Sequence, residues 1–394
     1  MKKIVAAVFF CLLFSISSVM AQGFRSQLDK ALTLANAGEL EQALTTAQEA
    51  LKFAEANTIP DHKDVAKAYD VLAQINNAKD RFPEAESYYL KRIALYEKGY
   101  GPQHKNVAAQ YNNLAFFYKE WGKDTKAEPA FGKAITILEK TLGLDAIELA
   151  KVKQNLGELY KMRGYFNLAE PIYKDVMRIR KKVYGSDHAL TAESINDMGE
   201  LYSYQQNYAR AAPYLVEAYE IRKKVLKSDH PDMAISLNNV AMLFKVKKRY
   251  REAISLYNDA LTIQKKVHGL NHSKTAMILS NAGECHIQSG QYVKAESLFN
   301  QALKITQALY GPYHYEVAMV LNNLGWLYLK QKRFDEAEPY YLKAITSAEQ
   351  SMGDDHPFLT AMFDGLATVY RVMGRVDEAR KLEQKSAMIR SMQQ

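Results

Sequence analysis

The chain has 394 residues, of which 24% are charged and 48% hydrophobic, and its formal net charge is +8. This balance is typical of a soluble globular protein and excludes a low-complexity chain or one made mostly of membrane spans. Length alone favours two or three domains, but a repeat that runs through the whole sequence favours one elongated array instead.

The first 21 residues predict a secretory signal peptide. Lys2 and Lys3 precede an apolar run over residues 4–14, and small residues up to Ala21 form a cleavage pattern. The continuous apolar run is shorter than the roughly 20 residues that a spanning helix needs. We therefore expect cleavage near Ala21, export to the periplasm or the medium, and no transmembrane segment in the mature chain; an uncleaved anchor is the alternative. Cleavage also removes Cys11 and leaves Cys285 alone, at a register position that predicts a small core residue.

A period of 42 residues organises the rest of the chain, and its clearest copy is the stretch Leu321 to Ile345. One alanine recurs at this stride nine times: Ala43, Ala85, Ala127, Ala169, Ala211, Ala253, Ala295, Ala337 and Ala379. A fixed period of this size is typical of a solenoid, in which each unit buries its apolar face against its neighbours.

Each repeat predicts two helices and no strand, as residues 107–121 and 125–142 illustrate with apolar residues at helical spacing. A short turn such as Gly122-Lys123-Asp124 separates them. A glycine at 101, 143, 185, 269, 311 and 353 is placed to end the second helix in the left-handed conformation. Two residues later we expect a side-chain cap for the next first helix, from Asp61, Asp145, Asp187, Asp229, Asn271 and Asp355. Small residues in both helices let them approach closely, and tyrosines fill the flanking volume.

This pattern resembles the tetratricopeptide repeat, and the 42-residue stride is similar to the kinesin-light-chain type. The likeness is closest in residues 322–328 (NNLGWLY) and 337–341 (AEPYY), and in the connector Lys227-Ser228-Asp229-His230-Pro231. The resemblance implies an all-α, right-handed superhelical solenoid of about nine helix-turn-helix repeats. We assign residues 22–63 to a degenerate first unit, 64–376 to tandem repeats, and 377–394 to a polar capping helix. No heptad-rich segment is present, so a role in motor transport is not expected.

The resemblance also implies a concave groove, lined by one stripe of the first helices, in which asparagines hydrogen-bond the backbone of an extended peptide. An amide offers both a donor and an acceptor, which suits a peptide unit. The alternative is that these asparagines tie neighbouring helices together through backbone groups. The stripe comprises Asn113, Asn155, Asp197, Asn239, Asn281 and Asn323, together with Lys151, Phe116, Glu158, Glu200, Met242 and Trp326. Lys67 and Lys151 could meet a carboxylate of the partner.

Seven histidines recur at the stride, in the connectors: His62, His104, His188, His230, His272, His314 and His356. Stacked helices lie about 8–10 Å apart, so equivalent histidines cannot share an ion that needs bonds of about 2 Å. We expect them to cap helices. Glu158, Glu200 and Glu284 fall on separate repeats, so paired acid–base catalysis would need distant groups to converge. We identify no enzyme motif, cofactor site or metal site.

Basic residues cluster at 178–182, 222–224, 245–251 and 265–266. Most of these clusters close second helices, where cations suit the negative end of the helix dipole. We therefore do not expect nucleic acid as a partner, and favour an anionic partner or peripheral contact with an anionic envelope surface. Two functions remain open: an exported, non-enzymatic scaffold that binds a peptide or protein segment in its groove, or a structural, self-associating envelope component without a groove ligand.

Overall fold

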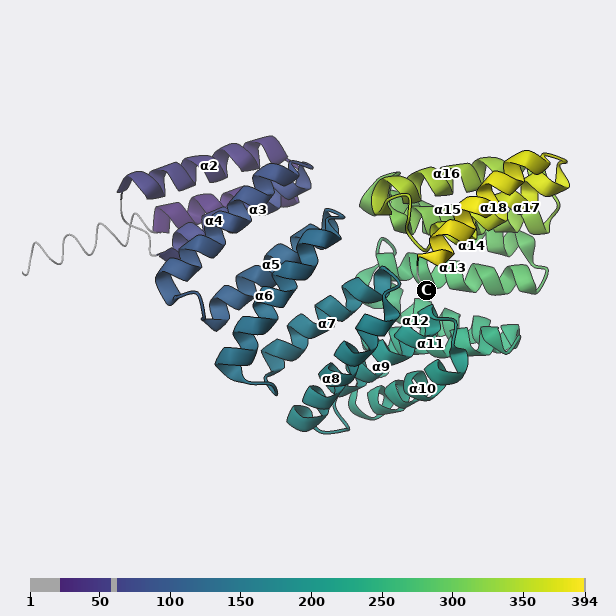
Figure 1. Ribbon diagram of the computed structural model, residues 1–394, viewed down its shortest axis with the longest axis horizontal. Coiled ribbons are helices and arrows are strands. Elements are labelled where there is room, and N and C mark those ends of the chain that lie inside the picture. The colour runs from purple at the N-terminus through teal and green to yellow at the C-terminus, as the bar shows by residue number, and fades with distance from the viewer. Residues whose placement is uncertain (1–21, 58–61, 393–394) are drawn as a thin grey trace, which may run out of the picture. The chain divides into compact units, whose positions relative to one another are not determined.

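The computed structural model describes residues 22–57 and 62–392, and within them the chain is all helical (Figure 1). The segment assigned to a signal peptide, together with Asp61, lies outside the described residues. The first described helix spans 22–36, and the others are α2 (Leu40–Asn57), α3 (His62–Ala78), α4 (Phe82–Tyr100), α5 (Lys105–Glu120), α6 (Asp124–Leu142), α7 (Ile147–Met162), α8 (Phe166–Tyr184), α9 (Ala189–Tyr204), α10 (Tyr208–Val225), α11 (Pro231–Val246), α12 (Tyr250–His268), α13 (Ser273–Gln288), α14 (Tyr292–Tyr310), α15 (Tyr315–Lys330), α16 (Phe334–Met352), α17 (Leu359–Val372) and α18 (Val376–Ser391). The expected helix-turn-helix repeats are therefore confirmed.

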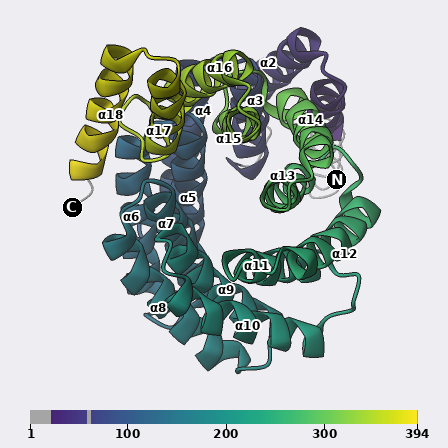
Figure 2. The same cartoon turned by 90° about the vertical axis from the view of Figure 1, so that its right-hand side faces the viewer.

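The chain divides into two compact units, Met1–Asn155 and Leu156–Gln394. In each unit the two helices of a repeat pack against each other, and the second helix packs on the first helix of the next repeat. In the second unit the first helices α9, α11, α13, α15 and α17 lie on the inner side of a curve, with the second helices outside them (Figure 2). The first helices of the second unit therefore line the inner side of this curve.

Small residues set the distance between the two helices of a repeat. A Cβ placed on Gly199 of α9 would lie 2.5 Å from Leu215 Cδ2, and one on Gly283 of α13 would lie 2.7 Å from Phe299 Cε1. Neither distance is possible for real atoms, so the helices can approach this closely only because these positions carry no side chain. The prediction that small residues permit close helix packing is confirmed at these repeats.

The turn inside each repeat uses one residue with positive φ. This residue is Gly38, Gly122, Gly164, Gly290 or Gly374 in five repeats, with φ of 69–82°. In the other four it is Asp80, Gln206, Lys248 or Lys332, with φ of 55–60°. A side chain at positive φ costs energy, so the turn is imposed on these four repeats by the packing of the helices on either side.

The connectors between repeats differ from the prediction in their caps. Glycine ends α4, α6, α8, α12, α14 and α16 with φ of 76–88°, as predicted, but its ψ is extended rather than helical. The next helix is capped by histidine: the Nδ1 atoms of His104, His188, His230, His272 and His314 accept from the backbone N–H two residues later. The predicted caps Asp187, Asp229 and Asn271 are wrong, because each lies one residue too early. The prediction that the histidines serve the connectors is confirmed.

The first repeat has an apolar core, and Cys285 lies in the core of its own repeat. Phe24, Leu28 and Ala31 of the helix at 22–36 are buried against α2 and α3, so the degenerate first repeat still has an apolar core. Cys285 is fully buried in α13, and burial raises the pKa of its thiol to about 12. The predicted core role of this cysteine is confirmed.

Candidate functional site

A buried lysine on the inner side of the second unit holds two carboxylates together. Lys161, near the end of α7, is 3% exposed, and its Nζ lies 2.7 Å from Glu158 Oε2 and 3.2 Å from Glu200 Oε2. Burial lowers the pKa of Lys161, but the two carboxylates outweigh this effect and hold it well above its usual value. Tyr173 donates to Glu158 Oε2 at 3.1 Å. Glu158 and Glu200, which belong to separate repeats, therefore converge on one ammonium group.

Asparagine side chains link the first helices of the second unit. Asn239 Nδ2 donates to Asn196 Oδ1 at 2.8 Å and to Glu200 Oε1 at 3.2 Å. Asn239 also accepts from Asn238 Nδ2 at 3.1 Å and is 6% exposed. Asn281 Nδ2 donates to Asn238 Oδ1 at 2.8 Å. The asparagines thus tie neighbouring helices together through side chains rather than backbone groups, and Asn239 could meet a peptide only by breaking these bonds.

The lysine–glutamate–asparagine arrangement recurs two repeats later. Lys245 Nζ lies 2.7 Å from Glu284 Oε2, and Asn323 Nδ2 donates to Glu284 Oε1 at 3.4 Å. Burial lowers the pKa of Lys245, and Glu284 more than reverses that effect. Unlike Asn239, both Asn281 and Asn323 are half-buried, so part of each amide faces solvent.

The predicted residues of the first unit are more open. Asn155 Nδ2 donates to Asn112 Oδ1 at 3.0 Å, which repeats the link between first helices. Asn113, Lys151 and Phe116 are exposed, and Phe116 retains 43% of its accessible surface. The Nζ of Lys119 lies over the Phe116 ring, 5.3 Å from its centroid.

The remaining predicted residues are half-buried or already paired. Asp197, Met242 and Trp326 each keep part of their surface on the stripe of their own repeat. Lys67, which could have met a carboxylate of the partner, instead lies 3.0 Å from Asp29. Peptide contact stays a prediction for every residue of the stripe.

The second unit curls until residues far apart in sequence touch. Arg163 donates to the carbonyl of Met352 at 3.4 Å, across 189 positions of sequence. The rings of Tyr204 and Phe358 lie 6.2 Å apart, and a Cβ on the neighbouring Gly164 would lie 3.2 Å from Pro357 Cγ. We call this set of interactions the closure contact; it brings the α7–α8 turn against the connector between α16 and α17.

Two recesses flank the closure contact on the inner side and share Tyr204, Met319 and Phe358. The first recess has a volume of about 250 Å³ and is also lined by Lys161, Met162, Gly164, Phe166, Gln206, Asn322, Pro357, Thr360, Ala361 and Met362. The second recess has a volume of about 300 Å³ and is also lined by Ala276, Met277, Ser280, Asn281, Glu284, Thr306, Tyr315, Glu316, Val320 and Asn323. The structure thus brings the predicted Asn281 and Asn323 together in one recess.

Sequence reasoning missed the aromatic residues of both recesses. Tyr204 ends α9, where the equivalent residues 78, 162 and 246 are Ala, Met and Val, and Phe358 stands where residue 316 is Glu. Each departs from the register, and this departure is the signal that could have singled them out. The pairing of the two could not be anticipated, because it depends on how far the helices rotate over several repeats.

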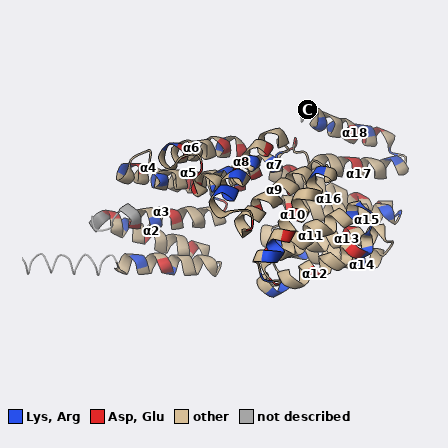
Figure 3. Cartoon of the chain, turned by 90° about the horizontal axis from the view of Figure 1, so that it is seen from below, with Lys and Arg blue, Asp and Glu red and all other residues tan. Residues whose placement is uncertain are grey.

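Basic residues close several second helices, as predicted, and Figure 3 shows where lysine and arginine lie. Lys181 and Lys182 close α8, and Lys265 and Lys266 close α12. Arg180 and Arg222, however, are 5% and 2% exposed and cannot belong to a charged surface. Arg222 Nη1 donates to Ser236 Oγ at 3.0 Å and so ties α10 to α11.

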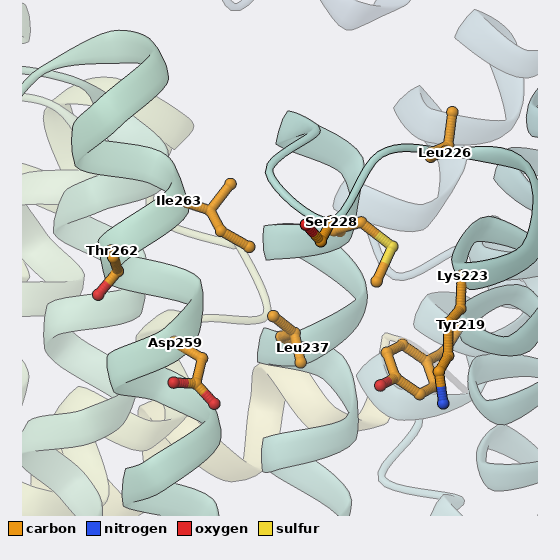
Figure 4. A pocket seen from close by; sticks show the side chains of 9 residues that line it. Tyr219, Lys223, Leu226, Ser228, Leu237, Asp259, Thr262 and Ile263 are labelled. Atoms are coloured by element: carbon orange, nitrogen blue, oxygen red, sulfur yellow. The ribbon is translucent and has the colours of Figure 1, made fainter.

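A separate recess lies between α10, α11 and α12 (Figure 4), and its volume is about 430 Å³. It opens beside the one connector in this region that lacks glycine: Lys227 stands at that position, α10 ends at Val225, and Leu226 is extended. Tyr219 and Lys223 lie on one side of the recess, and Asp259 and Ile263 on the other (Figure 4).

The described ranges 22–57 and 62–392 hold neither a metal cluster nor a membrane-spanning helix. They contain no group of three or more His, Cys, Asp or Glu placed to hold a metal ion. No helix in the same ranges is long and apolar enough to cross a membrane.

Comparison with solved structures shows similarity to helical-repeat proteins. The chain resembles a Rap protein complexed with competence and sporulation factor (13% identity over 95% of this chain and 99% of that chain, TM-score 0.61). It also resembles aspartyl phosphate phosphatase F from Bacillus subtilis (13% identity, 93% and 94% covered, TM-score 0.57). The kinesin light chain repeats of Podospora anserina match 50% of this chain and 94% of their own, with 20% identity and a TM-score of 0.40. At 13% identity, the likeness to the Rap protein and to the phosphatase shows the fold alone.

No curated protein matches the chain. The tetratricopeptide repeat family model matches in overlapping copies at residues 24–98, 64–140, 106–182, 148–224, 213–266, 232–308, 274–350 and 327–390. No catalytic family is indicated, and the fold is that of an interaction scaffold. Because these matches extend over nearly all of the chain, it belongs to the tetratricopeptide repeat family.

Proposed function

We propose that this protein is an exported, non-enzymatic scaffold whose second unit binds a peptide or protein segment along the inner stripe of its first helices. The observation that carries the proposal is the pair of adjoining recesses at the closure contact. Together they offer aromatic and methionine side chains for apolar contact and three asparagines for backbone recognition. Apolar walls with a few convergent polar groups are typical of ligand sites.

The asparagines differ in what they can offer a peptide. Asn322 Oδ1 is buried without a hydrogen-bond partner among the described residues, so it is an acceptor for a peptide N–H. Asn281 and Asn323 each donate a hydrogen bond to a neighbouring first helix, and both line the second recess. Asn239, which is buried and fully bonded, acts in helix packing. In support of a ligand on this fold, the similar Rap protein is complexed with competence and sporulation factor.

Display of random octapeptides against the immobilised protein tests the proposal. An enriched peptide is synthesised with a fluorescent label, and its affinity is measured by polarisation. We expect Asn322→Ala to weaken binding by about fivefold to tenfold, the value of one hydrogen bond, without lowering the melting temperature. The matched control is Asn258→Ala, an exposed asparagine on the outer helix α12. No enrichment, with light scattering that shows concentration-dependent assembly, would favour a self-associating structural component instead.

Export is tested separately from binding. Residues 1–21 are fused to a reporter that is active only outside the cytoplasm, and the recovered protein is sequenced from its N-terminus. We expect reporter activity and a mature start after Ala21. An inactive reporter, or a recovered chain that still begins with residue 1, would contradict the cleaved export signal.

A further inference from the structure

The second recess contains a carboxylate that no cation of the described residues balances. Glu284 is paired with Lys245 at 2.7 Å. Glu316, half-buried at the start of α15, has no lysine or arginine within ion-pair distance in the described ranges. Its carboxylate accepts only the Tyr315 hydroxyl, at 3.4 Å. A partly buried carboxylate without a cation is costly, and burial raises the pKa of Glu316 accordingly.

The charges around the shared wall of the recesses are predominantly negative. Burial raises the pKa of Tyr204, Lys161 acts against that rise, and Glu158, Glu200 and Glu316 add to it. Lys161 is already engaged by Glu158 and Glu200. The carboxylates around Tyr204 therefore outnumber the ammonium groups, even with Lys161 Nζ 5.0 Å from the centroid of its ring, and the excess of negative charge favours a cation from outside the protein.

The walls of the second recess suit a long aliphatic stem with a cationic tip. The rings of Tyr204, Tyr315 and Phe358 line it together with the flexible thioethers of Met277 and Met319. Methylene groups pack well on such side chains. An ammonium or guanidinium group is attracted to the face of an aromatic ring, most strongly where water is excluded.

An independent observation places an unused polar group in the same recess. The Ser280 hydroxyl is 9% exposed and has no hydrogen-bond partner among the described residues. It lines the second recess with Glu316 and Glu284. A buried hydroxyl left without a partner loses about 1–3 kcal/mol relative to one that is hydrogen-bonded, so a donor entering the recess would find an acceptor ready.

We propose that the second recess binds a lysine or arginine side chain of the partner segment, with the stem against Met277, Met319 and Phe358 and the cationic head at Glu316 and Ser280 Oγ. The inference rests on the proposed function, since it assigns one residue class of the bound segment. The backbone of that segment lies over Asn281 and Asn323 at the mouth of the recess.

The test uses the purified protein and five fluorescent octapeptide pools, degenerate except for a central Lys, Arg, norleucine, citrulline or Glu. Norleucine keeps the aliphatic stem of lysine, and citrulline keeps the shape of arginine, both without the charge. We expect the Lys and Arg pools to bind about fivefold or more tightly than their neutral counterparts, and the Glu pool to bind most weakly. This comparison needs no variant and therefore no assumption about folding.

Variants then locate the preference. Glu316→Gln should reduce the ratio between charged and neutral pools to less than about twofold. The matched control is Glu349→Gln, a half-buried glutamate of α16 outside both recesses. Equal affinities for charged and neutral pools, or a preference that survives Glu316→Gln, would overturn the inference while the proposed function stands. No binding in any pool would instead overturn the proposed function, and this inference with it.

Discussion

Removing the Lys161 ammonium tests the buried network at its centre. In Lys161→Met the side chain keeps most of its apolar volume, but Glu158 and Glu200 lose the cation that lies 2.7 and 3.2 Å from them. Breaking a buried ion pair by deleting one partner costs about 3–5 kcal/mol, because the remaining charge stays buried without compensation. Because both carboxylates are partly exposed, we expect a loss of unfolding free energy near the lower end of this range, at about 3 kcal/mol. For a cooperative unit of this size that corresponds to a fall in melting temperature of about 6–12 °C.

The pH dependence distinguishes this electrostatic loss from lost packing. In the wild type, burial raises the pKa of Glu200. Lys161 and the asparagine donors lower it by more than burial raises it, so the pKa of Glu200 lies below its usual value. This contribution is present above the unfolded pKa, about 4.3 for glutamate, and is lost as pH falls through the folded value. In Lys161→Met the pKa of Glu200 should instead lie above its usual value, because burial then acts without the lysine cation. The variant's deficit should therefore be largest near pH 7 and smallest below about pH 4.

Urea unfolding followed by circular dichroism at pH 7 and pH 4 measures both effects. The control is Lys119→Met, the equivalent residue one repeat earlier, which is half-buried beside Phe116 and should change stability by less than about 0.5 kcal/mol. Adding Glu158→Gln and Glu200→Gln to Lys161→Met should recover part of the loss. A deficit under about 1 kcal/mol that is the same at both pH values would refute the reasoning.

Two further predictions concern the turns and caps. Lys332→Gly should stabilise the second unit by about 0.5–1 kcal/mol, because Lys332 is held at φ 60°, where glycine has no steric cost. The midpoint of urea unfolding measures this gain, and an unchanged or lower midpoint would contradict backbone strain at Lys332. His356 Nδ1 accepts from Phe358 N–H at 3.3 Å, and burial together with Arg163 lowers its pKa to about 4. Since the folded pKa lies below the unfolded value near 6.5, about 3 kcal/mol of stability should be lost as pH falls from 6.5 to 4. His356→Asn, which can still accept the N–H bond, should remove this part of the acid sensitivity in melting curves at pH 7 and 4.5, and an undiminished sensitivity would assign it to other groups.

Much of the fold could be predicted from the sequence because each repeat depends on local spacing. The stride of one alanine and the small residues at Gly199 and Gly283 require two closely packed helices, and the structure has them. The cap was missed for a local reason. In His188 and its equivalents the backbone is extended, so that Nδ1 reaches the N–H two residues on, while Asp187 lies outside that geometry.

The candidate site was predictable only in part. The spacing places Glu158 and Glu200 on one stripe, but on separate repeats. The long side chain of Lys161 reaches both carboxylates and so connects the two repeats. Lys161 is three residues after one glutamate and 39 before the other, which is one stride less three, so the bridge could have been found from the sequence. The closure contact could not have been found from the sequence. It joins Arg163 to Met352 through the accumulated rotation of several repeats, and no local pattern encodes that sum.

The division between repeated and departing residues explains how such a protein can change its ligand without losing its fold. Positions that recur, such as Gly325 and Ala337, are buried where helices meet, and a change there alters every contact around it. Tyr204 and Phe358 depart from the register and line the recesses, where they contribute little to helix packing because part of each faces open space. Substitutions at these two positions should therefore alter what binds far more than whether the chain folds. Glu316 also lies in a recess rather than between packed helices, so the energetic cost of its unbalanced carboxylate does not weaken the helix packing. A bound cation would remove that cost.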